Sequence, residues 1–278
     1  MTAEPATATG SFTASDGTDL FTRSWMIPEP RYDLLLVHGL NEHSGRFDTT
    51  AGRFNAHGAN VYSYDIRGHG QTSGSRGDLS AWSDLLSDIS EMAMASAASS
   101  GRPWVLYGHS VGGLQAAGYL IDHAEPAPNI AVLSAPAMVA TRPIDGVLKV
   151  ACRLLGTVAP SLMISTGVKG DQLSKDPSVG EAYFADEHVE LKKTPRFGYA
   201  GYGEQDRLSN LMAGITIPTL VIHGANDVIV QPSASAGLAA SPAVERKIYP
   251  GLSHEMHNEP EAEQVYGEVT DWIEAKLF

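Results

Sequence analysis

The sequence predicts an α/β fold in which helices flank both faces of a mostly parallel central sheet. Short continuous apolar runs, such as residues 34–37, are typical of strands that are buried on both sides. Segments long enough to form helices separate most of these runs, and this alternation favours a doubly wound domain. The chain has 278 residues, of which 43% are hydrophobic and 18% charged. That composition supplies enough apolar surface for a substantial core.

The expected elements follow one another in a regular order. Residues 1–10 lack the basic and apolar regions of a secretory signal, so we expect a short disordered lead-in there. Asp16-Gly17 is a turn pair between residues 11–14 and 19–25, which predicts a β-hairpin. Further strands are expected at residues 34–37, 61–64, 104–107, 130–133, 219–222 and 247–249, and helices at residues 46–57, 80–99, 111–123 and 259–278.

Residues 137–212 break this alternation, because they contain no convincing strand and several interrupted helical patterns. An unstructured loop of this length is improbable in a compact domain, so we predict a helical cap inserted after the sixth strand. The core domain then comprises residues 11–136 and 213–278. The cap carries an apolar stripe, which either packs on the core or meets a lipid or acyl chain. The stripe consists of Val147, Leu148, Ala151, Leu154, Leu155 and Val158.

Charge and cysteine content exclude several classes of protein. The net charge of −13 argues against binding to nucleic acid, which requires a basic surface. The single cysteine, Cys152, excludes an intramolecular disulfide and a cysteine-based zinc cluster. No histidine spacing predicts a metal site, and no run approaches the roughly 18 apolar residues of a membrane span. We expect a cytoplasmic protein without a metal or organic cofactor. The sequence is also compatible with peripheral contact with a membrane.

The most informative motif is Gly108-His-Ser-Val-Gly112, which matches G-x-S-x-G. It follows an apolar run and precedes a helical pattern, which is the strand–turn–helix context that a nucleophilic serine requires. Small neighbours allow the strand and the helix to approach each other, and the sharp turn exposes the serine oxygen. We therefore predict that Ser110 is a nucleophile.

A nucleophilic serine needs a base, and the base needs an acid that orients it. The apolar run at residues 219–222 leads into Gly224-Ala-Asn-Asp227, which places a carboxylate just beyond a strand. Three other acidic residues lie in the insertion and are poorer candidates: Asp186, Glu204 and Asp206. The segment after residues 130–133 offers no acid. We predict that Asp227 orients the base.

Two histidines compete for the role of base. His254 follows the last expected strand directly, in a turn that contains glycine. His257 lies one helical turn further on, where a capping or surface position is expected. We favour His254.

The oxyanion of an acyl-transfer reaction needs two N–H donors near the nucleophile. One is expected from Val111, which directly follows Ser110. The other is expected from Leu40, in the His38-Gly39 turn at the end of an early strand. Both roles use the backbone alone, so the apolar side chains are free to pack in the core.

Together, these motifs resemble α/β-hydrolases of the monoacylglycerol lipase type, a group that includes lysophospholipases and serine aminopeptidase-like hydrolases. The resemblance covers residues 10–278 nearly completely. It is carried by His38-Gly-Leu-Asn-Glu-His-Ser-Gly-Arg46, Asp65-Ile-Arg-Gly-His-Gly70, Gly108-His-Ser-Val-Gly-Gly113, Leu133-Ser-Ala-Pro136, His223-Gly-Ala-Asn-Asp227 and Tyr249-Pro-Gly-Leu-Ser-His254.

The resemblance implies an α/β-hydrolase fold and places Ser110, Asp227 and His254 at the triad positions. It places Leu40 and Val111 at the oxyanion positions, and it implies that the insertion is a cap over an acyl channel. The loop from Asp65 to His69 is then structural and internally paired. This chain departs mildly from the family's pattern: Asn41 stands where glycine is usual, Val111 where methionine is common and Gln71 where serine is usual. Asparagine tolerates the left-handed conformation nearly as well as glycine does.

The expected reaction is two-step acyl transfer on a lipid ester, with monoacylglycerol cleaved to glycerol and a fatty acid. Alternatives are a carboxylesterase, lysophospholipase or thioesterase that acts on other esters. A peptidase of the aminopeptidase branch should bind the substrate amine with acidic cap residues, for which the candidates are Asp171, Asp176, Glu181 and Glu187. A non-catalytic ligand-binding protein has no need of a triad. The sequence does not indicate an oligomeric state.

Overall fold

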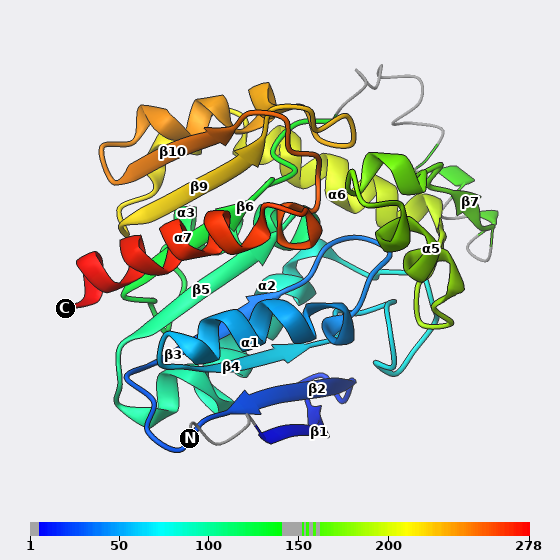
Figure 1. The fold of residues 1–278 in the computed structure, drawn as a ribbon. Helices are drawn as coiled ribbons and strands as arrows, with labels where there is room; N and C mark the ends of the chain where they lie inside the picture. Colours follow the sequence, from blue (N-terminus) through cyan, green and yellow to red (C-terminus); the bar gives the residue numbers. More distant parts are fainter. Residues whose placement is uncertain (1–5, 141–151, 153, 156–157, 160–161) are drawn as a thin grey trace.

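The computed structural model describes residues 6–140, 152, 154, 155, 158, 159 and 162–278. Its main feature is an eight-stranded sheet with the strand order β1-β2-β4-β3-β5-β6-β9-β10 (Figure 1). β1 and β2 pair antiparallel, as do β2 and β4, and all other neighbours in the sheet are parallel. This mostly parallel sheet confirms the predicted fold class.

The strands of this sheet are β1 (Ala6–Thr13), β2 (Asp19–Met26), β3 (Tyr32–Val37), β4 (Ala59–Tyr64), β5 (Trp104–His109), β6 (Ile130–Ser134), β9 (Thr219–Gly224) and β10 (Val244–Tyr249). The α-helices that lie wholly within the described residues are α1 (Asp48–Ala56), α2 (Trp82–Ala95), α3 (Val111–Ile121), α5 (Pro177–Ala185), α6 (Pro195–Leu208) and α7 (Ala262–Leu277). Short 3₁₀ helices are η1 (Ser44–Phe47), η2 (Ala97–Ser100), η3 (Gly170–Gln172), η4 (Met212–Gly214), η5 (Pro232–Ala240) and η6 (Met256–Asn258).

The predicted hairpin is present but starts earlier than expected. Thr13 pairs with Asp19 across the turn, and Gly17 has a φ of 88°, a left-handed conformation that glycine adopts without strain. β1 begins at Ala6, so the expectation of a disordered lead-in up to residue 10 is wrong for residues 6–10. The backbone of these residues is ordered because it pairs with β2 along the whole strand. A short segment of small and polar residues does not by itself predict this pairing.

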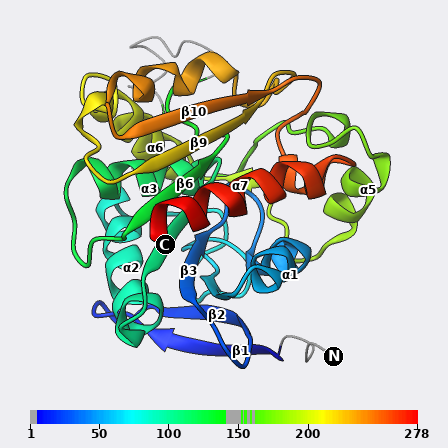
Figure 2. The ribbon, with the colours of Figure 1, turned by 60° about the vertical axis from the view of Figure 1, so that its left-hand side comes forward.

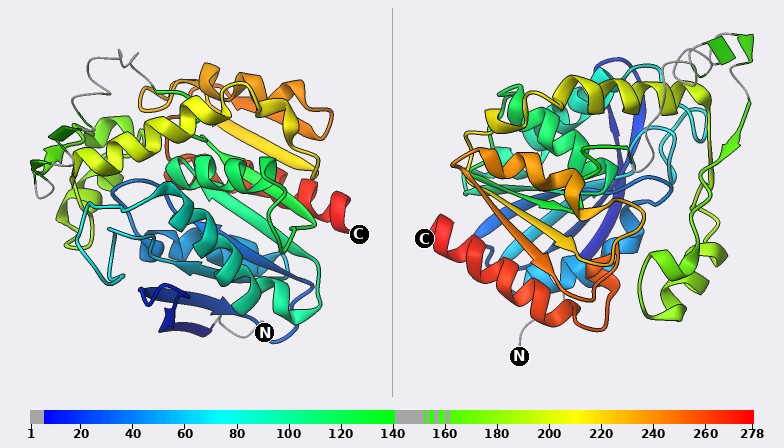
Figure 3. Two further views of the ribbon diagram at one scale, coloured as in Figure 1. Left: turned by 180° about the vertical axis from the view of Figure 1, so that it is seen from behind. Right: turned by 90° about the horizontal axis from the view of Figure 1, so that it is seen from above.

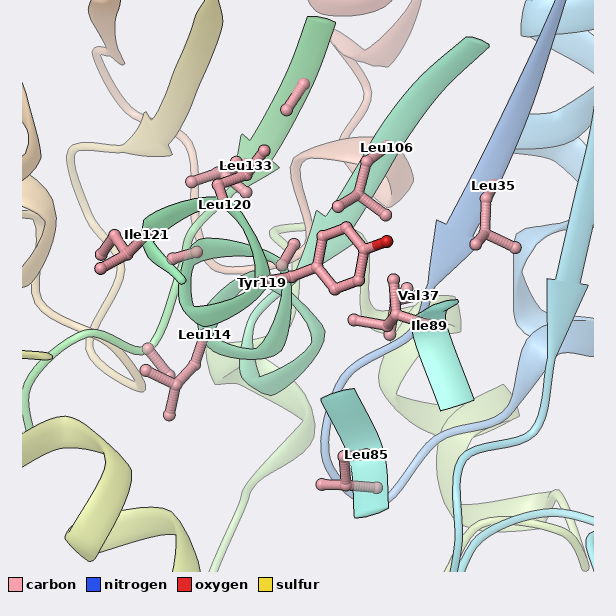
Figure 4. Packing of buried hydrophobic residues seen from close by; sticks show 14 of the residues in the cluster. Leu35, Val37, Leu85, Ile89, Leu106, Leu114, Tyr119, Leu120, Ile121 and Leu133 are labelled. Atoms are coloured by element: carbon pink, nitrogen blue, oxygen red, sulfur yellow. The ribbon is translucent and has the colours of Figure 1, made fainter. Parts of the chain in front are cut away.

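Two hydrophobic layers cover the two faces of the sheet. Leu35, Val37 and Leu106 point toward α2 and α3 (Figure 4). On the opposite face, Leu36 and Tyr107 pack with residues of α1 and α7. Figure 2 shows α1 and α7 on this face, and the left panel of Figure 3, a view from behind, shows α2 and α3 on the other face. Because successive side chains of a strand point to opposite faces, strands covered on both sides are apolar at nearly every position.

The insertion between β6 and β9 lies beyond the carboxyl ends of the parallel strands (Figure 3). It contains α5 and α6, but also β7 (Ile164–Ser165) and β8 (Lys192–Lys193), which pair antiparallel. The expectation that residues 137–212 contain no strand is therefore wrong. Two-residue strands that pair across a long sequence separation leave no periodic pattern to detect. The division into core and cap domains stays a prediction.

The apolar stripe of the insertion is only partly described. Val147, Leu148 and Ala151 lie outside the described residues. Of the remaining members, Leu154 and Val158 are 58% and 76% exposed. Within the described part of the chain, no helix is long and apolar enough to cross a membrane.

The packing of α3 against the end of β3 generates a stability prediction. A Cβ on Gly112 would overlap the carbonyl oxygens of Val37 and His38, which belong to backbone that cannot move aside easily. We expect Gly112→Ala to lower the midpoint temperature of unfolding by about 5 °C or more. Gly267→Ala is the matched control in α7, because its Cβ would have no neighbour within 4 Å. That substitution should leave the midpoint unchanged or raise it. Equal midpoints for both variants would contradict this packing.

Candidate active site

Ser110 lies on the sharp turn between β5 and α3. Its φ of 54° and ψ of −115° are unusual for a residue with a side chain and are typical of a strained functional turn. The turn is possible because its neighbours are small: a Cβ on Gly108 would overlap Gly112 O, and a Cβ on Gly113 would lie 2.9 Å from Pro136 Cα. The local geometry therefore matches the strand–turn–helix context that the motif predicts.

The structure brings Ser110, His254 and Asp227 together in one hydrogen-bonded chain. The Ser110 hydroxyl lies 3.0 Å from His254 Nε2, and His254 Nδ1 lies 2.6 Å from Asp227 Oδ2. Asp227 follows β9 and His254 follows β10, so adjacent strands place the two side chains at the same edge of the sheet. All three residues are buried.

Asp227 is held as an anion by its surroundings. Burial by itself would raise the pKa of this carboxyl group. The positive charge of His254, hydrogen bonds from His223 and His254, and the Val230 N–H at 2.8 Å outweigh that effect. The pKa of Asp227 therefore lies well below its ordinary value. Ile229 N–H also donates to Oδ1, at 2.9 Å.

His223 is a residue that the sequence analysis did not single out for the site. Its Nε2 lies 2.8 Å from Val230 O and 3.2 Å from Asp227 Oδ2, so this nitrogen carries the hydrogen that both acceptors share. His223 Nδ1 faces the Ser235 hydroxyl at 3.1 Å. The Oδ2 atom of Asp227 is thus contacted by both His223 and His254.

The pKa of His254 is shifted by two opposing effects. Burial lowers it, because the charged imidazolium loses its hydration. The charge and hydrogen bond of Asp227, together with the charges of Glu255 and Glu42, raise it by more. The net result is a pKa above the ordinary value, so the site stabilises a proton on His254.

The turn between β3 and η1, residues 38–43, is here called the oxyanion turn after its predicted role. Asn41 has a φ of 71°, which confirms that it takes the left-handed conformation expected where glycine is usual. A Cβ on Gly39 would lie 3.0 Å from Ser110 Cβ, so the turn passes directly beside the serine. Leu40 is half-buried in this turn, and Val111 is the first residue of α3. Their roles as donors stay predictions.

His257 does not occupy the capping or surface position that we expected. It is 1% exposed, and its ring stacks on Phe47 with a centroid distance of 4.7 Å. It also meets His109 edge-on at 4.9 Å, and His109 lies 4.9 Å from His254. The expectation is wrong because His257, in η6, packs against Phe47 of η1 and against His109 instead of facing solvent.

The rejected acids have other partners. Asp186 bonds His43 Nε2 at 2.8 Å, and Glu204 pairs with Arg207 at 2.7 Å. The expectation that the loop from Asp65 to His69 is internally paired is wrong for its charged side chains. Arg67 binds Asp16 and Asp88. The Asp65 carboxylate accepts from Ser44 N–H and Gln71 N–H, each at 2.8 Å.

The four acidic cap residues do not all line one site: Asp171 and Glu181 line a single surface pocket, which Lys175 also lines, whereas Asp176 and Glu187 are not part of its lining. Asp171, Glu181 and Glu187 are exposed. Asp176 instead caps α5, since its carboxylate accepts from Ser178 N–H at 2.9 Å. In the described residues, no group of three or more histidine, cysteine, aspartate and glutamate side chains could hold a metal ion.

The fold and this Ser–His–Asp arrangement define a serine hydrolase with an α/β-hydrolase fold. The model of the family described as "Serine aminopeptidase, S33" matches residues 28–261, so the chain belongs to that family. A monoacylglycerol lipase from Mycolicibacterium smegmatis is 35% identical over 257 residues, which cover 90% of each chain.

Two further comparisons agree with the lipase and esterase type of serine hydrolase. The phospholipase YtpA of Bacillus subtilis is 26% identical over 251 residues, covering 87% of this chain and 95% of that protein. The crystal structure of Paleococcus ferrophilus monoacylglycerol lipase superposes with a TM-score of 0.82 at 25% identity, covering 92% of this chain and 99% of that one.

The charge balance of the site predicts how the reactivity of Ser110 depends on pH. His254 accepts the serine proton only in its neutral form, and its pKa is raised, so reactivity falls as the pH drops through that pKa. The rate at which a fluorophosphonate probe labels Ser110 should therefore reach half its plateau at a pH above about 6.5. Asp227→Asn should move this midpoint to lower pH and reduce the plateau by about 10⁴-fold. A midpoint that the substitution leaves in place would contradict the assigned pairing.

Proposed function

We propose that this protein hydrolyses carboxylic esters of lipids through an acyl-enzyme on Ser110. Ser110 Oγ attacks the ester carbonyl while His254 accepts its proton, and the alcohol leaves with that proton. Water then attacks the acyl-enzyme with the same assistance. Asp227 fixes the tautomer of His254 and stabilises its charged form. The observation that carries this proposal is the buried hydrogen-bonded chain from Ser110 to Asp227.

The oxyanion of each tetrahedral intermediate is assigned to the N–H groups of Leu40 and Val111. Val111 begins α3, so its N–H also carries the positive end of the helix dipole. The proximity of Gly39 to Ser110 supports the assignment of Leu40 in the same turn. Oriented donors in a buried site are typically worth about 10²–10³ in kcat each.

We propose monoacylglycerol as the preferred substrate, with glycerol and a fatty acid as products. Two proteins that are named monoacylglycerol lipases align with this chain over most of its length, and one of them is 35% identical. The similarity to a phospholipase supports lysophospholipid or another ester as the alternative substrate. The family's peptidase name has less support, because three of the four candidate acidic cap residues are exposed and the fourth is a helix cap.

We also propose that the insertion meets lipid at a membrane surface. Several of its apolar side chains are 38–76% exposed, although a folded protein usually buries them. They are Leu154, Val158, Leu162, Ile164, Phe184 and Tyr199.

Hydrolysis rates for monoacylglycerols of increasing chain length test the substrate. We expect turnover of medium or long chains that falls by at least about 10⁴-fold in Ser110→Ala. Ser63→Ala is the matched control, because it removes a buried hydroxyl in β4 that donates to Leu36 O. That variant should keep its activity. If the wild type cleaves short simple esters but no monoacylglycerol, Ser110 remains the proposed nucleophile, but the proposal that lipid esters are the substrates is wrong.

A further inference from the structure

A buried ionic network connects the oxyanion turn to the loop that carries His254. Arg46 binds Glu255 through two hydrogen bonds of 2.7 and 2.8 Å, and it binds Glu42 at 3.0 Å. Both carboxylates are 2% exposed. One guanidinium thus faces two buried acids, so one negative charge beside the site stays uncompensated whenever both acids are ionised. Burying a carboxylate without a full counter-charge lowers the stability of the folded protein, so this network calls for a functional explanation.

Glu42 makes its closest contact with the backbone of the oxyanion turn. Its Oε1 accepts from Gly39 N–H at 2.6 Å, and both residues are buried. A Cβ on Gly39 would lie only 2.7 Å from this oxygen, so the carboxylate fills the space that any larger residue would need. The next peptide carries the Leu40 N–H. The position of Glu42 therefore sets the position of that donor.

The network also reaches the base. Glu255 directly follows His254, and its own N–H donates to Leu173 O of the insertion at 2.8 Å. Arg46 lies over the ring of Tyr183 in α5, 4.6 Å from its centroid. The oxyanion turn, the His254 loop and the insertion are therefore joined by one set of buried contacts.

We propose that Glu42 is a positioning residue for the ester hydrolysis proposed above: it holds the His38–Gly39 peptide, and through it the next peptide with the Leu40 N–H, and it supports positive charge on His254. The inference rests on that proposed function. Glu42 accepts no proton from the substrate and forms no bond to it. It acts through the backbone of the oxyanion turn and through the electric field at His254.

The charges around these two groups determine the expected pH dependence. The titratable groups that face Glu42 are Arg46, Tyr107, Tyr183, His254 and Glu255. The titratable groups that face His254 are Glu42, His109, Asp227, Glu255 and His257. Burial raises the pKa of Glu42 to about 7, against the opposing effects of Arg46 and the Gly39 N–H. Burial lowers the pKa values of His109 and His257, so both rings stay neutral. Removing the Glu42 charge therefore lowers the pKa of His254.

Two substitutions separate the hydrogen bond from the charge. Glu42→Ala leaves the buried Gly39 N–H without an acceptor, and we expect kcat for a short p-nitrophenyl ester to fall at least about tenfold with KM within about threefold. Glu42→Gln keeps an acceptor oxygen but no charge. Its kcat should stay within about threefold at alkaline pH. The acidic limb of its kcat/KM profile should move down by about half a pH unit, because wild-type Glu42 is itself partly protonated near pH 7 and only part of a charge is removed there.

Asp33→Asn is the matched control, because Asp33 is also a buried acid bound to an arginine, Arg102, at 2.8 and 3.1 Å. It lies at the start of β3, whereas the oxyanion turn follows the end of that strand. This variant should lose stability while its acidic limb stays in place. If Glu42 has only a structural role, Glu42→Gln should likewise lose stability while its acidic limb stays in place.

The outcomes distinguish the two proposals. A folded Glu42→Ala with wild-type kcat, or a Glu42→Gln whose acidic limb does not move, would overturn the role of Glu42 alone. If Glu42→Ala does not fold, as judged by circular dichroism, the acidic limb of Glu42→Gln decides. A folded wild type that turns over no ester would instead overturn the proposed function.

Discussion

The site depends on how closely the start of α3 approaches the carboxyl ends of β3 and β5. At this point glycine backbone touches backbone, and a single added Cβ on Gly112 would overlap two carbonyl oxygens. The approach forces Ser110 into a left-handed conformation and brings the oxyanion turn beside it. Strain at a functional turn persists only where the surrounding packing over-determines it. Here the two hydrophobic layers on the sheet supply that packing.

The second organising feature is the burial of charge around His254. Asp227, Glu42 and Glu255 all raise the pKa of this imidazole, against the cost of its burial. The neutral rings of His109 and His257 complete its surroundings without adding a competing positive charge. In the proposed mechanism, these charges stabilise the proton that His254 takes from Ser110. Groups that are already in place need no solvent rearrangement to do so. Stability is given up for this arrangement, because each buried carboxylate loses its hydration.

The parts of this account that follow from local sequence were predictable. Ser110, Asp227 and His254 each stand just after an apolar run, and parallel strands bring such positions to one edge of a sheet. The contact between Arg46 and Glu255 spans 209 positions in the chain and has no local pattern, so only the structure reveals it. The same holds for the short pairing of β7 with β8, for the burial of His257, and for the first residues of β1, which are ordered by their partner strand.

The central claim is that Ser110 carries the acyl group between the two steps. An ester with a good leaving group, such as a p-nitrophenyl ester, acylates the enzyme faster than water deacylates it, so the intermediate accumulates. Rapid acid quenching followed by peptide mass spectrometry should find one acyl group per protein on the peptide that contains Ser110, together with a matching burst of nitrophenol. Turnover without a burst and without any adduct on that peptide would contradict the account.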